Sequence, residues 1–290
     1  MSQRLALGTV QFGLPYGVAN RSGLVGPDAV RSIVNQAAAA GCDTLDTAIA
    51  YGASEQCLGE IGVGRWRVVS KLPPLPDSET DVDAWVQRSV LGSLQRLKVA
   101  RLYGLLLHRS EQLLGSRGSA LYRALVAVKE RGHAEKIGVS IYDPAELDAI
   151  GPRFELGLVQ TPFNIFDRRI ALSGWLARLH DAGVEIHVRS IFLQGLLLME
   201  PAIRPERFSG WAPLWRRWDD WLAAKELTPL EACVRFALSR SEVERVVVGV
   251  DSPQQLQQIL ASTGTASTMP PETLVSDDLN LINPSRWSTP

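Results

Sequence analysis

The stretch that decides the fold is TLDTAIAYGASEQCLGEIGVGRWRVVSK, residues 44–71. It begins with a short run at Thr44–Asp46, passes through a loop into a segment of helical period at Ser54–Glu60, and ends with an apolar run at Val68–Lys71. Short strands that alternate with helical segments are typical of βαβ units, in which a crossover helix joins two parallel strands. The stretch therefore predicts one such unit.

The same alternation continues in both directions and gives eight strand–helix units in 290 residues. The expected strands are Leu5–Gly8, Thr44–Asp46, Val68–Lys71, Leu102–His108, Lys136–Ser140, Leu156–Gln160, Glu185–Ile191 and Arg245–Gly249. The expected helices are Pro27–Ala40, Ser54–Glu60, Asp81–Leu97, Ala120–Arg131, Pro144–Ile150, Arg168–Ala182, Pro229–Ser239 and Pro253–Ala261. Eight units close a barrel, so we predict a single (β/α)8 TIM barrel domain over residues 1–290, with a loop-rich tail from about residue 264.

Composition excludes several classes of protein. Lys and Arg number 30 against 31 Asp and Glu, so no general positive charge is available for nucleic acid or an anionic membrane. The apolar runs are shorter than the roughly 18 to 20 residues that span a bilayer, and no secretory signal pattern follows Arg4, so we expect a cytoplasmic protein, monomeric or a small homo-oligomer. The cysteines at 42, 57 and 233 lack metal-ligand spacing, which predicts buried free thiols and no metal site.

Two segments lie outside the repeating pattern. The Pro- and Arg-rich stretch Met199–Gly210 follows the seventh strand, where it is placed to rim a pocket. Four tryptophans recur with helical spacing at 211, 215, 218 and 221, which predicts a packed helical face rather than an aromatic ligand cage.

Polar residues follow three consecutive strands at the end of the barrel where chemistry is found. Asp46 ends the second strand, Lys71 the third and His108 the fourth, and Tyr51 lies in the loop just above Asp46. Each residue alone has a structural interpretation. Asp46 could cap a helix or turn, Lys71 could be a solvated strand end, and His108 and Tyr51 could serve in packing and structural hydrogen bonds. Their joint placement favours a chemical site.

Together these four side chains suit carbonyl reduction. A phenol with a pKa near 10 is a poor acid at neutral pH unless a nearby cation favours its ionised form, and Lys71 can be that cation. A buried ammonium needs a partner to remain charged, which Asp46 can supply, while His108 can hydrogen-bond and orient a carbonyl oxygen.

At this point the chain resembles the aldo-keto reductase family, from LGTVQFG at residues 7–13 to VGVDSP at residues 248–253. The family's D-x-x-x-x-Y-G matches Asp46–Gly52, and its strand-end Lys and His match Lys71 and His108. The resemblance implies a (β/α)8 barrel that reduces aldehydes or ketones with a nicotinamide cofactor. It implies Tyr51 as the general acid, Lys71 and Asp46 as the residues that tune it, and His108 as the residue that orients the substrate.

The resemblance also implies a set of cofactor-binding residues. Ser140 and Gln160 would hold the nicotinamide carboxamide, although Ile141 stands where the family commonly has Asn, and Arg189 stands where an aromatic residue usually stacks on the nicotinamide. A guanidinium plane can also stack on a ring, while an ion-pair role for Arg189 remains an alternative. The full predicted set is Gly8, Thr9, Asp46, Ser140, Gln160, Arg189, Ser190, Gly249, Ser252 and Gln255.

The adenosine phosphate is expected at the start of the last helix, where Ser252 and Pro253 suit the N-cap and first helical position. Many relatives that use NADPH carry Arg within the next turn, yet residues 246–263 contain no Lys or Arg, and Gln255 occupies a corresponding position. The resemblance favours NADP(H), and the missing base leaves NAD(H) as an alternative.

Two other functions remain open. Lys71 could form a Schiff base in a barrel lyase or aldolase, or the chain could be a non-catalytic, cofactor-sensing regulatory subunit. The substrate is expected to be a small carbonyl compound, with a sugar or nucleotide sugar as a family-level guess. Its specificity should come from the loops after Val10 and after the fourth and seventh strands, and from the tail around Trp287.

Overall fold

The computed structural model describes residues 2–264 and 269–287. Eight parallel strands form a closed barrel in sequence order, each paired with the next and the last paired with the first. They are β1 (Leu5–Gly8), β2 (Thr44–Asp46), β3 (Arg67–Leu72), β4 (Leu102–Leu107), β5 (Ala134–Ser140), β6 (Leu158–Pro162), β7 (Glu185–Arg189) and β8 (Arg245–Gly249). The closed ring confirms the predicted TIM barrel.

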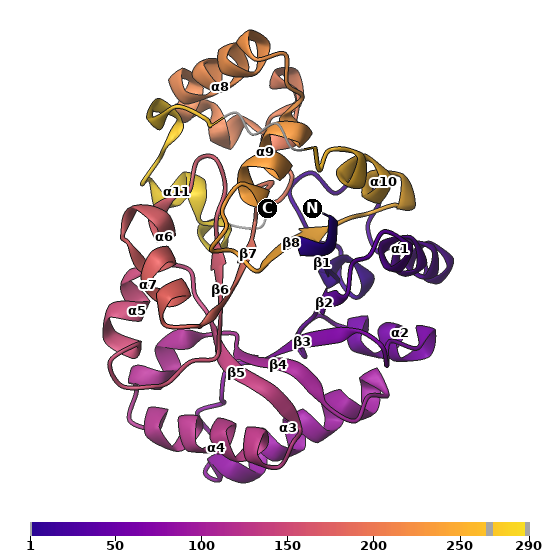
Figure 1. Cartoon of the computed structure of the whole chain (residues 1–290), viewed down its shortest axis with the longest axis vertical. Helices are drawn as coiled ribbons and strands as arrows, with labels where there is room; N and C mark the ends of the chain where they lie inside the picture. Colours follow the sequence, from indigo (N-terminus) through magenta and orange to yellow (C-terminus); the bar gives the residue numbers. More distant parts are fainter. Residues whose placement is uncertain (1, 265–268, 288–290) are drawn as a thin grey trace.

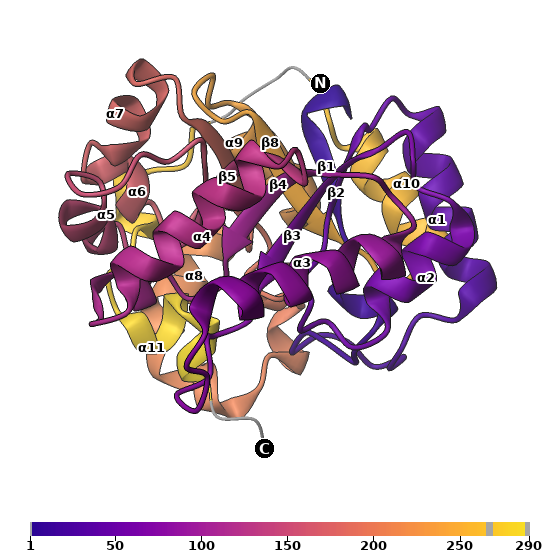
Figure 2. The same cartoon turned by 90° about the horizontal axis from the view of Figure 1, so that it is seen from below.

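Helices surround the strands, as Figures 1 and 2 show from two directions. They are α1 (Pro27–Ala39), α2 (Ser54–Ile61), α3 (Val82–Leu97), α4 (Gly118–Glu130), α5 (Ala145–Ile150), α6 (Arg169–Leu172), α7 (Trp175–Asp181), α8 (Ala212–Ala224), α9 (Pro229–Leu238), α10 (Pro253–Ala261) and α11 (Leu279–Ile282). Helices α1 and α10 lie side by side although they come from opposite ends of the chain, because β8 returns to β1 (Figure 1).

One predicted helix is divided. The segment expected as a single helix over Arg168–Ala182 forms α6 and α7, separated at Ser173 and Gly174. Gly174 takes φ of +79°, a left-handed conformation that ends a right-handed helix and that glycine adopts without a Cβ clash. The seventh strand also ends earlier than predicted, at Arg189, because Ser190 leaves the extended conformation with φ of +59°.

The tail is more structured than the loop-rich segment that we predicted. Beyond residues 265–268, which lie outside the described residues, it forms the 3-10 turn η7 (Glu272–Leu274), helix α11 and the turn η8 (Pro284–Arg286). Leu281 and Ile282 are fully buried, and Trp211 Nε1 donates to Asp278 Oδ2 at 3.0 Å. The tail therefore packs into the core beside α8.

The expected packed tryptophan face is confirmed, and the expectation of buried cysteines needs one correction. Trp215 and Trp218 of α8 are buried, and Trp211 and Trp221 pack partly buried beside them, so this is a packed helical face. All three cysteines are free, but Cys57 is only half-buried, because it lies toward the outer side of α2. Within the described residues, no helix is long and apolar enough to cross a membrane and no cluster of His, Cys, Asp or Glu suits a metal ion.

Candidate active site

Asp46 and Lys71 form a buried ion pair at the carboxyl ends of β2 and β3. Lys71 Nζ lies 2.7 Å from Asp46 Oδ2 and donates a second hydrogen bond to the carbonyl of Thr47 at 2.9 Å. The other carboxylate oxygen, Oδ1, accepts from Gln160 Nε2 at 2.6 Å across the barrel. Asp46 thus connects the lysine on one side of the barrel mouth to β6 on the other.

Tyr51 lies directly beside this pair. The Lys71 ammonium is 5.1 Å from the centre of the Tyr51 ring, and the His108 ring meets that ring edge-on at 5.7 Å. The structure therefore brings together all four residues that the sequence predicts for the chemical site.

The loop that carries Tyr51 is held against the loop after β1. Ser54 Oγ donates to the carbonyl of Thr9 at 2.8 Å, and Thr9 Oγ1 donates to the carbonyl of Asp46 at 3.0 Å. Gly52 has φ of +54°, and a Cβ there would lie 2.3 Å from the carbonyl oxygen of Gly13. Gly13 and Gly52 lie where the two loops cross, and they allow a close approach of the backbones that side chains would block.

Burial dominates the electrostatics of these groups. Burial and the Asp46 carboxylate raise the pKa of Tyr51 above its ordinary value of 10. Burial also lowers the pKa of Lys71, opposed by Asp46, and burial with the charge of Lys71 lowers the pKa of His108 to about 4. The net lowering of the Tyr51 pKa that the sequence predicts is therefore not found: Arg189 acts to lower this pKa, and burial outweighs that effect.

A cavity of about 720 Å³ opens at this end of the barrel. It is lined by the loops after β1, β7 and β8 and by the start of α9, whose Thr228 and Pro229 contribute to its wall. Most of the predicted site residues line it, namely Gly8, Thr9, Asp46, Tyr51, His108, Gln160, Arg189, Ser190, Gly249 and Gln255. Three of the predicted residues are not in the lining: Lys71 is buried and paired with Asp46, Ser140 is buried at the end of β5, and Ser252 caps α10.

The ends of β5 and β6 carry a pair of side chains that suits a carboxamide. Ser140 and Gln160 pair in register on β5 and β6, so their side chains project to the same side. Ser140 Oγ and Gln160 Oε1 are both buried and find no hydrogen-bond partner in the described part of the chain. The Gln160 amide nitrogen already donates to Asp46, so its oxygen remains free as an acceptor, and the Ser140 hydroxyl remains free as a donor. These two groups fit the N–H and the C=O, respectively, of a nicotinamide carboxamide.

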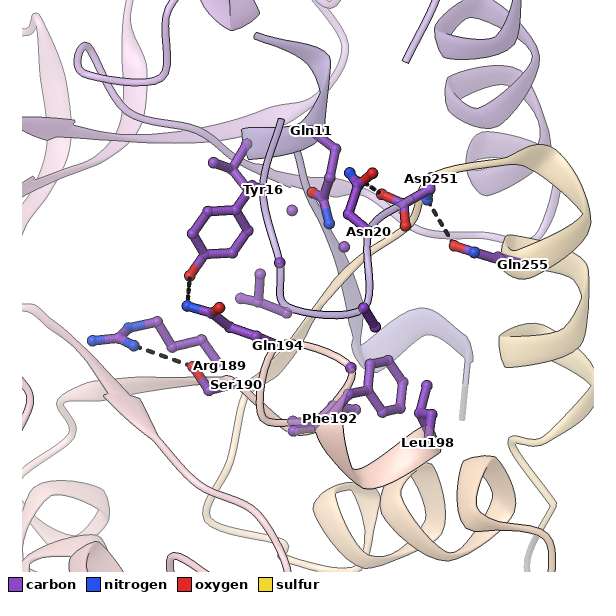
Figure 3. A pocket seen from close by; sticks show the side chains of 18 of the residues that line it. Gln11, Tyr16, Asn20, Arg189, Ser190, Phe192, Gln194, Leu198, Asp251 and Gln255 are labelled. Carbon is purple, nitrogen blue, oxygen red and sulfur yellow. Dashed lines mark hydrogen bonds between the residues drawn. The ribbon is translucent and has the colours of Figure 1, made fainter. Parts of the chain in front are cut away.

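One end of the cavity lies at the start of α10 (Figure 3). Ser252 caps the helix by accepting from the Gln255 backbone N–H at 3.2 Å, and Gln255 Oε1 accepts from the backbone N–H of Asp251 at 2.7 Å. Asp251 Oδ1 in turn accepts from Asn20 Nδ2 at 3.2 Å, and Figure 3 shows these two side chains facing each other. A helix N-terminus of this kind suits a phosphate group.

Several lining residues were missed by the sequence reasoning. The loop after β1 contributes Gln11, Tyr16, Asn20 and Arg21, and Tyr16 contacts the loop after β7 by accepting from Gln194 Nε2 at 3.1 Å. The sequence marks this loop only as a position for substrate specificity, because neither period nor spacing fixes the conformation of an irregular loop.

Arg189 ends β7, and its side chain reaches the loop that follows β5. Its Nη2 donates to the carbonyl of Ile141 at 3.0 Å, its Nη1 donates to Ser190 Oγ at 3.2 Å, and its guanidinium carbon is 4.6 Å from the centre of the Tyr142 ring. The position expected to stack on a cofactor thus has a stacking partner in the protein itself.

The predicted specificity segments divide in the structure. Met199 and Ile203, from the stretch after β7, line the cavity as expected. Trp287 does not line it; its ring packs against Phe208 at 4.9 Å, because the tail folds along α8.

Comparisons with known proteins agree with this geometry. The model of the Aldo/keto reductase family matches residues 4–269. PA4992, a candidate aldo-keto reductase from Pseudomonas aeruginosa, shares 24% identity, covers 90% of this chain and 89% of its own, and superposes with a TM-score of 0.66. The aldo-keto reductase AKR11C1 from Bacillus halodurans shares 19% identity, covers 91% of this chain and 88% of its own, and superposes with a TM-score of 0.73.

These structural likenesses support the fold, and no curated protein matches the sequence significantly. The family match spans all eight strands and every lining residue of the cavity. The chain belongs to the aldo-keto reductase family, whose members are oxidoreductases that use nicotinamide cofactors.

Proposed function

We propose that the protein reduces an aldehyde or ketone to an alcohol with NAD(P)H, and that NADPH is the favoured cofactor. The observation that carries the proposal is the buried Asp46–Lys71 pair beside Tyr51, in a cavity that Asp46, Tyr51 and Gln160 line. The unpartnered hydroxyl of Ser140 is buried beside Gln160, with which it pairs in register. The cofactor supplies a hydride when bound. The residues of the chain supply the proton and orient the carbonyl group.

Tyr51 is the proton donor in this proposal. Its raised pKa keeps the phenol protonated until charge develops on the substrate oxygen, when the proton moves from Tyr51 Oη to that oxygen. The Lys71 ammonium then stabilises the phenolate that forms. Asp46 keeps Lys71 charged, because a buried ammonium without a partner would lose its proton.

His108 orients the carbonyl group. With a pKa lowered to about 4, its ring is neutral at pH 7 and offers one N–H as a hydrogen-bond donor to the substrate oxygen. A neutral donor positions the oxygen without competing with Tyr51 as a proton source.

The Schiff-base alternative is disfavoured by the surroundings of Lys71. The side chain is 1% exposed, is absent from the lining of the cavity, and its ammonium donates to both Asp46 and the carbonyl of Thr47. A Schiff-base lysine must be unprotonated and must reach the substrate, whereas this partner favours the ammonium form. The regulatory-subunit alternative is disfavoured as well, because a subunit that only senses the cofactor needs no proton donor such as Tyr51 with Lys71 and Asp46 beside it.

The test is a panel of aldehydes, ketones and sugars, assayed by the absorbance of NADPH and of NADH in parallel. We expect cofactor oxidation with at least one class of carbonyl compound and no borohydride-trapped adduct on Lys71. Substrate trapped on Lys71 without any need for nicotinamide would overturn the reductase proposal in favour of the lyase. Tight cofactor binding with no turnover across the panel would favour the regulatory subunit.

A further inference from the structure

Arg189 is a half-buried cation in the cavity wall that pairs with no carboxylate among the described residues. Its guanidinium donates to a hydroxyl and to a backbone carbonyl, both uncharged, and rests on the Tyr142 ring. Arg169, which donates to the carbonyl of the same Tyr142, is by contrast paired with Asp143 and Asp167. Arg189 therefore brings an uncompensated positive charge into the cavity.

That charge lies beside the proposed carboxamide anchor. Arg189 donates to the carbonyl of Ile141, the residue that follows Ser140, and it pairs in register with Pro162, two residues after Gln160. The guanidinium thus reaches from the end of β7 to the residue that follows Ser140. A ring whose carboxamide binds the free atoms of Ser140 and Gln160 comes within electrostatic reach of Arg189.

The other groups at this end of the cavity supply little net charge. Lys71 and Asp46 neutralise each other, Tyr51 keeps its proton, and His108 is neutral at pH 7 because its pKa is lowered to about 4. Asp143, which follows Tyr142, is paired with Arg169, and Asp251 lies at the other end of the cavity beside Asn20 (Figure 3). Among the described lining residues the side chains with a fixed positive charge are Arg189 and Arg21, and Arg21 belongs to the loop after β1.

We propose that Arg189 makes the site discriminate between the two redox forms of the cofactor, so that the reduced form binds more tightly than the oxidised form. This inference rests on the proposed function. The oxidised nicotinamide ring carries a positive charge and the reduced ring is neutral, so Arg189 repels only the oxidised form. Two like charges a few ångströms apart at a partly buried site repel strongly enough to change affinity by tenfold or more. The oxidised product then leaves readily and the reduced cofactor rebinds.

The experiment is a titration of the full-length protein with NADPH and NADP⁺, and with NADH and NAD⁺, at one fixed ionic strength. Because both redox forms share the same adenosine and phosphate groups, the ratio of their dissociation constants isolates the nicotinamide ring. For the wild type we expect the oxidised form to bind at least about tenfold more weakly than the reduced form. Equal affinities would overturn the inference even before any variant is made.

Two variants separate charge from shape. Arg189→Gln removes the charge and keeps an amide donor, and we expect it to reduce the ratio at least about fivefold, mainly through tighter binding of the oxidised form. Arg189→Lys keeps the charge and should keep the ratio within about twofold of the wild type. An ADP-ribose 2′-phosphate fragment, which lacks the ring, should bind all three proteins equally. An unchanged ratio in Arg189→Gln contradicts the role of Arg189, whereas failure of the wild type to bind any nicotinamide form contradicts the proposed function itself.

Discussion

At the scale of single residues, Asp46 joins the two halves of the site. One carboxylate oxygen holds Lys71 beside Tyr51, and the other accepts from the amide nitrogen of Gln160, whose oxygen has no partner among the described residues. The sequence could predict Asp46, Tyr51, Lys71 and His108, because strand ends and motif spacing determine which side chains meet at the barrel rim. It could not predict the bond from Gln160 to Asp46, which depends on side-chain conformations across the barrel.

Removing Lys71 should separate activity from stability. Lys71→Met leaves Asp46 as a buried carboxylate with Gln160 as its remaining side-chain partner, and we expect a loss of about 3 to 5 kcal/mol in the free energy of unfolding. Carbonyl reduction should also be abolished. Adding Asp46→Asn removes the unpaired charge, so the double variant should recover most of the stability and none of the activity. Denaturant melts and single-turnover reduction measure both properties, and recovered turnover in the double variant would mean that neither residue tunes Tyr51.

At the scale of elements, the crossing of the β1 loop with the Tyr51 loop positions the proton donor. Gly13 and Gly52 are each too close to the other loop for a side chain, since a Cβ on Gly13 would lie 1.9 Å from the carbonyl oxygen of Tyr51. The sequence shows the glycines, yet the reason for them appears only in the folded contact. The break between α6 and α7 was missed for a similar reason: the helical period continues through Gly174, and only its φ of +79° reveals the turn.

Gly52→Ala tests this crossing. The new Cβ would meet the Gly13 carbonyl in a left-handed backbone conformation, so we expect a loss of about 2 kcal/mol or more in stability together with a fall in turnover. Gly64→Ala is the matched control, because nothing lies within 4 Å of its Cβ. Denaturant melts and turnover assays compare the two, and equal behaviour of both variants would show that the crossing does not position Tyr51.

A charged cluster near the start of β7 governs stability at acid pH. Glu185 accepts from Tyr103 Oη at 2.6 Å, contacts His187 Nε2 at 2.7 Å and forms an ion pair with Lys136. Burial acts to raise the pKa of Glu185, but the hydrogen bonds from His187, Lys136 and Tyr103 outweigh it and lower this pKa to about 2 from the ordinary 4.5. Because the folded-state pKa is the lower one, the carboxylate stabilises the protein fully above about pH 4.5, and this contribution is lost as the pH falls toward 2.

Glu185→Gln should therefore remove stability at pH 7 and remove progressively less of it as the pH approaches 2. By linkage the pH-dependent part of the loss in the free energy of unfolding is about 2 to 3 kcal/mol at neutral pH. The control is Glu155→Gln, because the Glu155 side chain has no part in the cluster. Denaturant melts between pH 3 and pH 7 measure the difference. A gap between wild type and variant that does not narrow at low pH would show that Glu185 contributes through shape alone.

At the scale of the whole molecule, the two ends of the chain build one cavity. Closure of the barrel between β1 and β8 places the loop after β1 against the start of α10, so that Asn20 reaches Asp251 and Arg21 joins Gln255 in the lining. The eight-unit alternation predicts this closure, but not which loop residues reach across it. The packing of the tail was also beyond the sequence, because its short turns carry no periodic pattern and are held by contacts with α8.

The shared cavity leads to a prediction about cofactor preference. No Lys or Arg lies in residues 246–263, whereas the exposed Arg21 lines the cavity from the opposite side of the closure, so we expect Arg21 to be the cation that a 2′-phosphate meets. We expect NADPH to be preferred over NADH by less than about 10³-fold, or roughly 4 kcal/mol. Arg21→Ala should lower that preference without weakening NADH binding. Fluorescence titration at fixed ionic strength measures the dissociation constants of NADPH and NADH for both proteins. A preference for NADPH that is larger than expected and unchanged in Arg21→Ala would show that the 2′-phosphate binds away from Arg21.

The central claim is that Tyr51 donates the proton in a carbonyl reduction, and Tyr51→Phe tests it most directly. The variant removes the phenol hydroxyl and keeps the ring that packs beside Lys71 and His108. The measurement is single-turnover oxidation of bound NADPH by an aldehyde that the wild type reduces, with the cofactor dissociation constant determined on the same samples. We predict a rate lowered by about 10² to 10⁴ with cofactor affinity changed less than about threefold. A variant that retains more than about a tenth of the wild-type rate would contradict the account.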